Sequence, residues 1–208
     1  MKKSSTEKTF DNFETWLYTY TVFLNKILNA KRVVATKWEK EELLEAFVLR
    51  VVSVWEIFVE NLIIDCLNKD TTKYGSYMDL RLPKNLPRAQ CEAMLNGLAY
   101  LDFPNVGSLK STARHVLVPT SNPFQAIPKA AERRIDEFLR MRNYLAHYST
   151  RSRRALKDAY RRNHGLIVFR EPGHFLYASR GKGGQPRFGD YVDSFFDAAK
   201  TMRKFLGV

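Results

Sequence analysis

The segment Arg140-Met141-Arg142-Asn143-Tyr144-Leu145-Ala146-His147-Tyr148-Ser149 is the most informative part of this chain of 208 residues. Apolar residues recur around it every three or four positions, which predicts an amphipathic helix with one buried face. These positions are Ile135, Phe138, Leu139, Leu145 and Ala146. Arg142 falls on the same apolar stripe, where a charge is costly unless it is paired or lies in a wet cleft. The stretch therefore predicts a helix that carries a polar site as well as a core face.

The polar residues of this helix are expected to lie on one line. Asn143 and His147 are four residues apart and share a helical face, and Arg140 and Arg151 extend that line. Arginine, amide and imidazole groups brought together in this way suit a phosphodiester better than they suit a core. The simpler alternative is structural: Arg142 pairs with Glu56, and His147 closes the C-terminal end of the helix through its charge or a hydrogen bond.

The segment from Arg142 to His147 resembles the signature of the HEPN superfamily, in which an arginine is followed four to six residues later by a histidine. The asparagine directly after the arginine is also frequent there. Tyr148 and Ser149, with Ser152 and Arg153, are most similar to the RiboL-PSP branch. The resemblance covers roughly residues 38–160. It implies a helical bundle that dimerises, with two copies of the motif facing each other in a cleft.

Many members of that superfamily cut RNA without a metal, and others only bind. The resemblance implies Arg142, Asn143 and His147 as catalytic residues, with Glu56, Tyr148 and Ser149 in support. Histidine suits acid or base work near neutral pH, and arginine suits the charge that develops on a phosphorane. One chain supplies one such histidine, so an acid and a base together would require two chains. No cofactor and no metal site are expected.

The composition is that of one globular domain spanning residues 1–208, with 45% hydrophobic and 27% charged residues. The net charge of +12 favours an anionic partner, nucleic acid first and an acidic membrane surface second. Charged residues interrupt the hydrophobic run 46–64, which argues against a membrane span. Cys66 and Cys91 have no metal-binding spacing and suggest buried thiols in a reducing compartment. With no visible signal peptide, we expect a cytoplasmic protein without a membrane partner.

Positive charge is concentrated in residues 129–162, which hold eleven Lys or Arg and four Asp or Glu. A charge run is usually a solvated face, but this one flanks the polar motif and is expected to guide RNA. The expected RNA-binding residues are Arg140, Arg151, Arg153, Arg154, Arg161 and Arg162.

The remaining pattern predicts an all-α bundle of about five main helices. Residues 1–9 are expected to be flexible, and Asp11 or Asn12 to cap the first helix. Thr36, with Glu39 at the capping-box position, is expected to begin a helix that continues to Asn68. Further helices are expected at 87–100, 128–148, 149–163 and 188–206, with one or two short ones in 101–128. Residues 166–169 and 174–178 suggest a small β-hairpin.

The second of these helices is apolar nearly all round between Leu43 and Leu67, so it needs cover on several sides. A second subunit would supply that cover, which predicts a homodimer. Glu56 interrupts the helix, and two interpretations stay open: a solvated edge or internal ion pair, or a contact that orients Arg142 in the cleft.

Three functions remain open on the sequence. The first is a metal-independent endoribonuclease, as a toxin or an antiviral defence effector. The second is a catalytically silent subunit that binds RNA or a nucleotide in the same cleft. The third is a structural dimerisation domain within a defence complex. An antitoxin or another member of a defence complex is the further partner to be expected.

Overall fold

The structure is a computed structural model that describes residues 5–29, 35–96, 103–179 and 186–208. The described residues form nine α-helices, two short 3-10 helices and no strand. The α-helices are α1 (Ser5–Leu28), α2 (Lys37–Lys69), α3 (Thr72–Tyr77), α4 (Arg88–Asn96), α5 (Val106–Val116), α6 (Lys129–His147), α7 (Thr150–His164), α8 (Pro172–Tyr177) and α9 (Arg187–Leu206). The 3-10 helices are η1 (Pro119–Ser121) and η2 (Pro123–Ala126). The all-α class is confirmed, and the five longest helices are α1, α2, α6, α7 and α9.

Helix α2 is the central element of the bundle, as its apolar sequence predicts. Thr36 begins it as a full capping box: its hydroxyl accepts from the Glu39 amide at 3.2 Å, and the Glu39 carboxylate accepts from the Thr36 amide at 2.6 Å. Its 33 residues span about 50 Å at 1.5 Å per residue. The predicted start and extent of this helix are therefore confirmed.

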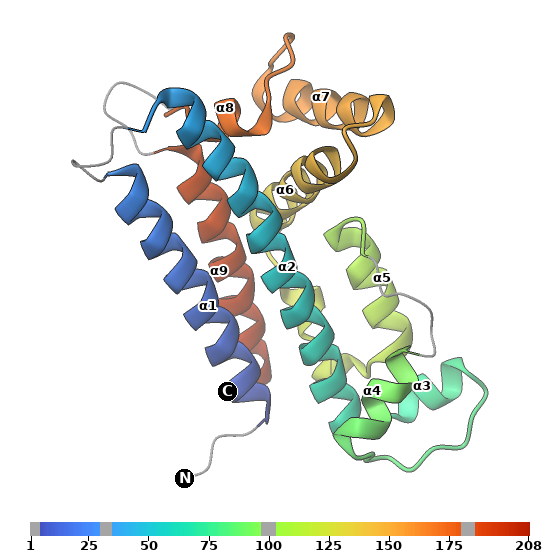
Figure 1. Ribbon diagram of the computed structural model, residues 1–208. Helices are drawn as coiled ribbons and strands as arrows, with labels where there is room; N and C mark the ends of the chain where they lie inside the picture. The colour runs from blue at the N-terminus through green and yellow to red at the C-terminus, as the bar shows by residue number, and fades with distance from the viewer. Residues whose placement is uncertain (1–4, 30–34, 97–102, 180–185) are drawn as a thin grey trace.

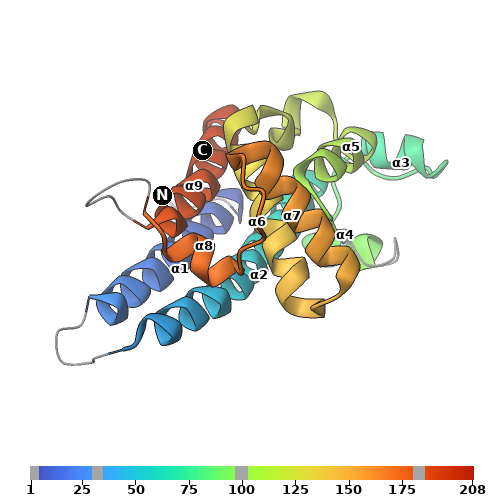
Figure 2. The same ribbon diagram turned by 90° about the horizontal axis from the view of Figure 1, so that it is seen from above.

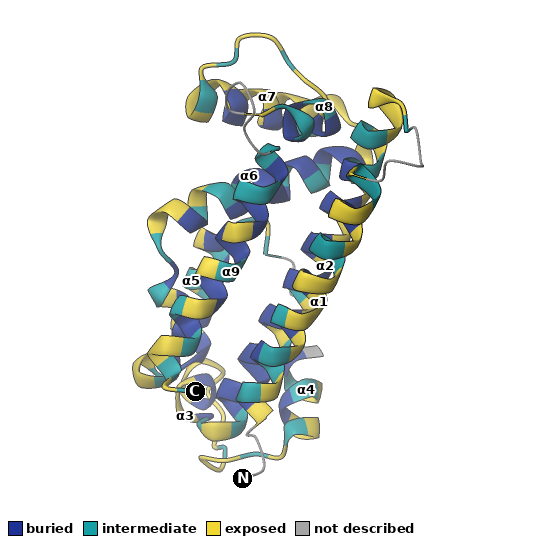
Figure 3. Cartoon of the chain, turned by 90° about the vertical axis from the view of Figure 1, so that its left-hand side faces the viewer, coloured by how far each residue is buried: buried dark blue, intermediate teal, exposed yellow. Residues whose placement is uncertain are grey.

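Aromatic side chains join α2 to the helices around it. Phe13 of α1 stacks on Phe58 of α2 with ring centroids 4.2 Å apart, and Trp55 meets Phe195 of α9 at 5.3 Å. Phe138 of α6 contacts the same Phe195 at 5.5 Å. Figure 1 shows α1 and α9 beside α2, with α6 crossing on the other side. Figure 3 shows the buried residues along the facing sides of these helices and the exposed residues on their outer sides.

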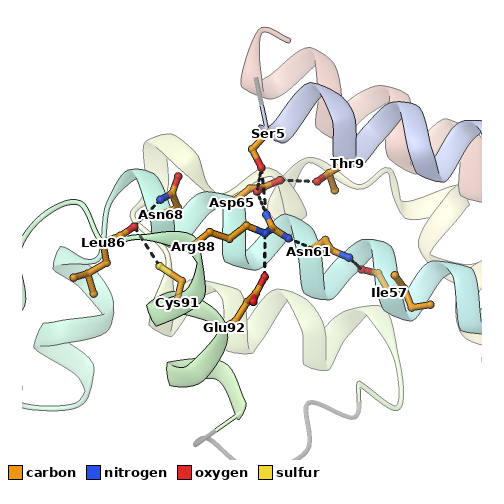
Figure 4. A network of polar contacts seen from close by, with 10 residues as sticks. All are labelled: Ser5, Thr9, Ile57, Asn61, Asp65, Asn68, Leu86, Arg88, Cys91 and Glu92. Carbon is orange, nitrogen blue, oxygen red and sulfur yellow. Dashed lines mark hydrogen bonds and ion pairs between the residues drawn. The ribbon is translucent and has the colours of Figure 1, made fainter. Parts of the chain in front are cut away.

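A polar clamp ties α4 to α1 and α2 at the end of the molecule where the chain begins (Figure 4). The Asp65 side chain is only 2% exposed, accepts from the hydroxyls of Ser5 and Thr9 at 2.6 Å each, and forms an ion pair with Arg88. Arg88 also donates to Asn61 and to Glu92. A buried carboxylate needs this many partners, because an unpaired charge in the core is strongly destabilising.

The clamp corrects the expected start of the first helix. The helix begins at Ser5, six residues before Asp11, because Ser5 and Thr9 are held on Asp65 and Phe10 is fully buried. Asp11 does not cap the helix and instead pairs with Arg203 of α9 at 2.7 Å. Residues 5–9 are thus helical, and residues 1–4 of the segment expected to be flexible lie outside the described residues.

The expected hairpin at 166–169 and 174–178 is wrong. Residues 166–169 form no ladder with described residues, and Pro172–Tyr177 is the short helix α8, with Pro172 in its first turn. Phe175 and Leu176 are buried, and α8 packs on α2. A run of four or five residues does not distinguish a strand from a helix, and here the packing against α2 decides. The small helix α3 was not expected, and residues 97–100 of the helix expected at 87–100 lie outside the described residues.

In the described ranges, no helix combines the length and the apolar character that crossing a bilayer requires.

Candidate functional site

The motif helix α6 and the arginine-rich helix α7 meet in a tight turn. Tyr148 ends α6 in the left-handed region with φ of 44°, and its amide donates to the Tyr144 carbonyl at 2.7 Å. Ser149 then caps α7, since its hydroxyl accepts from the Ser152 amide at 3.1 Å. The two helices consequently pack side by side, as Figure 2 shows from above. Ser149 and Tyr148, expected as supporting residues, build this turn.

An open groove of about 360 Å³ lies between the two helices. It is lined by Arg140, Asn143 and His147 of α6, by Ser149 at the turn, and by Arg151, Ser152 and Ala155 of α7. The structure therefore brings together five of the residues predicted for the site: Arg140, Asn143, His147, Ser149 and Arg151.

Arg142 does not line this groove. It lies on the neighbouring side of α6, where its side chain is 23% exposed and forms an ion pair with Glu56 of α2. The pairing of Glu56 with Arg142 that the sequence raised is observed, with Arg142 outside the groove. Because the guanidinium can bind two acceptors at once, this ion pair leaves one edge of Arg142 for a second contact.

That second contact is made with Asn143. The Nη1 atom of Arg142 donates to Asn143 Oδ1 at 3.1 Å. A guanidinium only donates hydrogen bonds, so the oxygen of the Asn143 amide must face it. The Nδ2 group of Asn143 is then the part of the amide that remains for the groove. The chain Glu56–Arg142–Asn143 thus fixes the groove residue as a hydrogen-bond donor.

His147 occupies the last turn of α6 and is exposed. Among the described residues, none forms a hydrogen bond with its ring. A positive imidazolium there would also interact favourably with the C-terminal end of the helix, as in the structural interpretation. Its position beside Asn143 and two arginines, at the open side of the groove, leaves the ring accessible to a bound molecule.

Tyr148 faces a different environment from the groove. It is 64% exposed and packs on Tyr144, with ring centroids 5.2 Å apart. The Tyr144 hydroxyl donates to Glu171 at 3.2 Å, and burial together with this carboxylate raises the pKa of Tyr144 to about 12. Burial raises the pKa of Tyr148 too, and the nearby charges of Glu45, Glu42 and Glu171 raise it further. The tyrosine pair therefore borders an acidic surface.

The arginines of α7 do not form a single ridge. Arg151 lines the groove with Arg140, and Arg162 lies on the same helical face as Arg151 by its spacing of eleven residues. Arg153 instead stacks over the Phe169 ring at 4.5 Å on another flank of α7. Arg154 and Arg161, seven residues apart and therefore on one helical face, lie between these two flanks. All five of these residues are exposed.

Two groove residues, Ser152 and Ala155, were not predicted as site residues. The signal that could have found Ala155 is its position one helical turn after Arg151. Its small side chain leaves room between the helices, and Ser152 adds a hydroxyl that bonds back to the Ser149 carbonyl at 3.0 Å.

The part of the chain that the structure describes contains no group of three or more His, Cys, Asp or Glu side chains arranged to hold a metal ion. In comparisons with known proteins, no family model matches the chain, and neither a curated protein nor a solved structure matches it.

Proposed function

We propose that the chain is a metal-independent endoribonuclease that cuts RNA in the groove between α6 and α7. The observation that carries the proposal is the convergence of His147, the amide of Asn143 and the cations Arg140 and Arg151 on one groove. The resemblance of residues 142–147 to the HEPN signature supports the same activity.

The groove residues match the demands of the reaction. His147 would exchange a proton with the ribose 2′-hydroxyl or with the leaving 5′-oxygen, and Asn143 Nδ2 would donate to a phosphate oxygen. Arg140 and Arg151 would hold the phosphates on either side. Attack by the 2′-oxygen gives products with 2′,3′-cyclic phosphate ends.

A homodimer is part of this proposal. The outward face of α2 carries Leu49 and Ile57, which are 40% and 57% exposed, and Trp16 of the adjoining α1 is 49% exposed. Glu56, which holds Arg142, borders this face of α2. An isologous contact through α2 would place the two Glu56–Arg142–Asn143 chains near the interface and supply a second histidine.

A silent RNA-binding subunit is the second candidate, and one observation favours it. Arg142, the cation expected to stabilise the phosphorane, is paired with Glu56 and does not line the groove. In that case the groove would hold RNA through Arg140 and Arg151 without cutting it.

The decisive test is RNA cleavage by the purified chain in EDTA. His147→Ala should lower the rate by about a hundredfold or more, because it removes proton transfer. His115→Ala, which changes an exposed histidine on α5, is the matched control and should leave the rate unchanged. A wild-type protein that binds RNA but leaves it intact would establish the silent subunit instead.

RNA binding can be tested separately from cleavage. The double variant Arg140→Glu with Arg151→Glu should weaken RNA binding by about tenfold or more and flatten its salt dependence, because phosphate contacts are lost. Lys73→Glu with Lys200→Glu makes the same charge change on exposed residues of α3 and α9 and should have a much smaller effect. Equal losses in the two variants would mean that net charge alone attracts RNA and that the groove has no special part in it.

A further inference from the structure

The connection between α7 and α8 projects from the molecule at the end opposite the chain termini (Figures 1 and 3). Its tip is formed by Ile167 and Val168, whose exposed fractions of 79% and 75% are the largest among the big hydrophobic side chains of the described residues. The residues on either side, Leu166 and Phe169, are partly buried and pack against the core. The tip is thus an outward bend with its two ends fixed to the protein.

The tip is anchored at its two ends, but its own backbone has no backbone hydrogen-bond partner among the described residues. The Leu166 amide donates to the Tyr160 carbonyl at 3.4 Å, and Arg153 covers the Phe169 ring. Within the described residues, no backbone hydrogen bond is formed by residues 167–170. Two branched aliphatic side chains are therefore presented to solvent, and no packing among the described residues requires their apolar character.

Cations lie on the α7 side of this tip, and on its other side Phe169 packs on Tyr144, which donates to Glu171. Arg153, Lys157 and Arg161 follow one another at a spacing of four residues, and Arg153 touches the connection itself. Arg170, directly after the tip, is also exposed. Residues 150–171 contain seven Lys or Arg and two Asp or Glu. This flank combines a convex apolar tip with a basic stripe.

We propose that this tip and the stripe Arg153–Lys157–Arg161 form a membrane-binding surface for anionic lipid. Ile167 and Val168 would enter the boundary between headgroups and acyl chains, and the cations would contact the lipid phosphates and carboxylates. The surface is separate from the groove and does not depend on RNA cleavage. The proposal departs from the expectation, drawn from the sequence, that the chain has no membrane partner.

The two other macromolecular partners fit this surface less well. RNA would bind the cations. Aliphatic side chains neither stack on bases nor form hydrogen bonds with them, so an RNA partner would not explain why Ile167 and Val168 are exposed. A protein partner would need about 800 Å² of matching surface on this side, far more than two side chains on a convex bend provide. A fluid bilayer needs no such complementary shape.

The test is sedimentation of the full chain with vesicles of phosphatidylcholine, alone or mixed with phosphatidylserine. The wild type should bind the mixed vesicles and ignore the neutral ones, and salt should weaken the binding. The variant Ile167→Ser with Val168→Ser should bind the mixed vesicles about tenfold more weakly, because apolar burial is lost. Met78→Ser with Leu80→Ser, which changes exposed apolar residues near α3, should bind like the wild type.

The stripe is tested with the same vesicles. Lys157→Glu with Arg161→Glu should abolish binding, whereas the charge-matched Lys73→Glu with Lys200→Glu should retain most of it. A tryptophan introduced by Val168→Trp should be quenched by lipids brominated on their acyl chains, which reports insertion directly. Circular dichroism confirms that each variant is folded.

Three results would overturn the proposal. The first is a wild type that fails to sediment with the mixed vesicles, and the second is equal binding to neutral and anionic vesicles. The third is a folded tip variant that binds as tightly as the wild type. That result would mean that charge alone attracts the protein to the vesicles and that the tip does not insert. RNA binding through Arg140 and Arg151 should be unchanged in the tip variant, so failure here and failure of the groove are separate outcomes.

Discussion

At the scale of single residues, burial in the core controls the reactivity of the two cysteine thiols. Cys66 and Cys91 are both buried, and burial raises the pKa of Cys66 to about 12 and also raises that of Cys91. Since the thiolate is the reactive form, neither cysteine should react with a disulfide reagent at mildly alkaline pH until the protein unfolds. An absorbance assay should therefore count no thiol in the folded protein and two in denaturant. A thiol that reacts without unfolding would show that the helices around it open locally.

The same pKa shift has a consequence for stability. An unfolded cysteine ionises near pH 9, well below the pKa of folded Cys66. As the pH rises past that value, the unfolded state loses its proton first and is favoured. The contribution of Cys66 is therefore fully present below about pH 9 and is lost progressively towards pH 12. Ionisation of Cys66 therefore favours unfolding at alkaline pH and does not contribute to unfolding at acid pH.

The site residues show which contacts helical spacing can predict. Asn143 and His147 share the groove because they are four residues apart on α6, and Arg140 and Arg151 join them as expected. The pairing of Arg142 with Glu56 joins residues 86 positions apart, so it depends on how α6 crosses α2. The sequence raised this pairing both as a structural ion pair and as a contact that orients Arg142 in a cleft, and only the packing of the helices places Arg142 outside the groove.

At the scale of elements, a glycine allows α8 to approach α2. A Cβ atom on Gly173 would lie 2.3 Å from the Glu41 carbonyl oxygen and 2.7 Å from its carbon. The Gly173 amide also donates to the Glu45 carboxylate at 2.8 Å. Gly173→Ala should lower the free energy of unfolding by about 2–3 kcal/mol, since the two backbones must separate. Urea titration measures this loss.

Gly189 is the matched control for that substitution. It lies in the first turn of α9, and a Cβ there would meet nothing within 4 Å. Gly189→Ala should raise the free energy of unfolding by about 0.5 kcal/mol, because alanine loses less backbone entropy. Equal effects at the two glycines would contradict the close contact between α8 and α2.

The elements differ in how far the sequence predicts them. Helix α2 carries its own start signal in Thr36 and Glu39 and its own long apolar pattern, so local chemistry defines it. Helix α8 has six residues, and its position comes from Gly173, Phe175 and the contact of His174 with Glu41 at 3.0 Å. Because such contacts lie far apart in sequence, α8 was expected as a strand.

At the scale of the whole molecule, the exposed side of α2 determines the proposed association. Ile57→Glu should shift the protein from a dimer to a 24.2 kDa monomer, because a charge would be buried at the interface. Light scattering at micromolar concentration measures the mass. Leu80→Glu, at an exposed residue after α3, should leave the dimer intact. A wild-type protein that is already monomeric under these conditions would contradict the dimer.

The whole-molecule arrangement is where sequence-based inference reaches its limit. Apolar spacing predicts an all-α protein because each helix must bury one face. The same spacing does not state which faces meet, so all the arginines of α7 singled out in the sequence were expected to bind RNA together. The observed contact between Arg153 and Phe169 divides them between two flanks. The division depends on where the chain runs after Gly165, and the residue spacing within α7 does not specify that path.

The course of the outer helices has a practical consequence for handling the protein. The start of α1 and the end of α9 lie at one end of the bundle, where Arg203 pairs with Asp11, and the α6–α7 turn lies at the other (Figure 1). A tag on either terminus would anchor the protein to a sensor chip with its groove and tip facing the flowing solution. Joining the two termini with a short linker would in the same way give a ring-closed chain that still presents both surfaces.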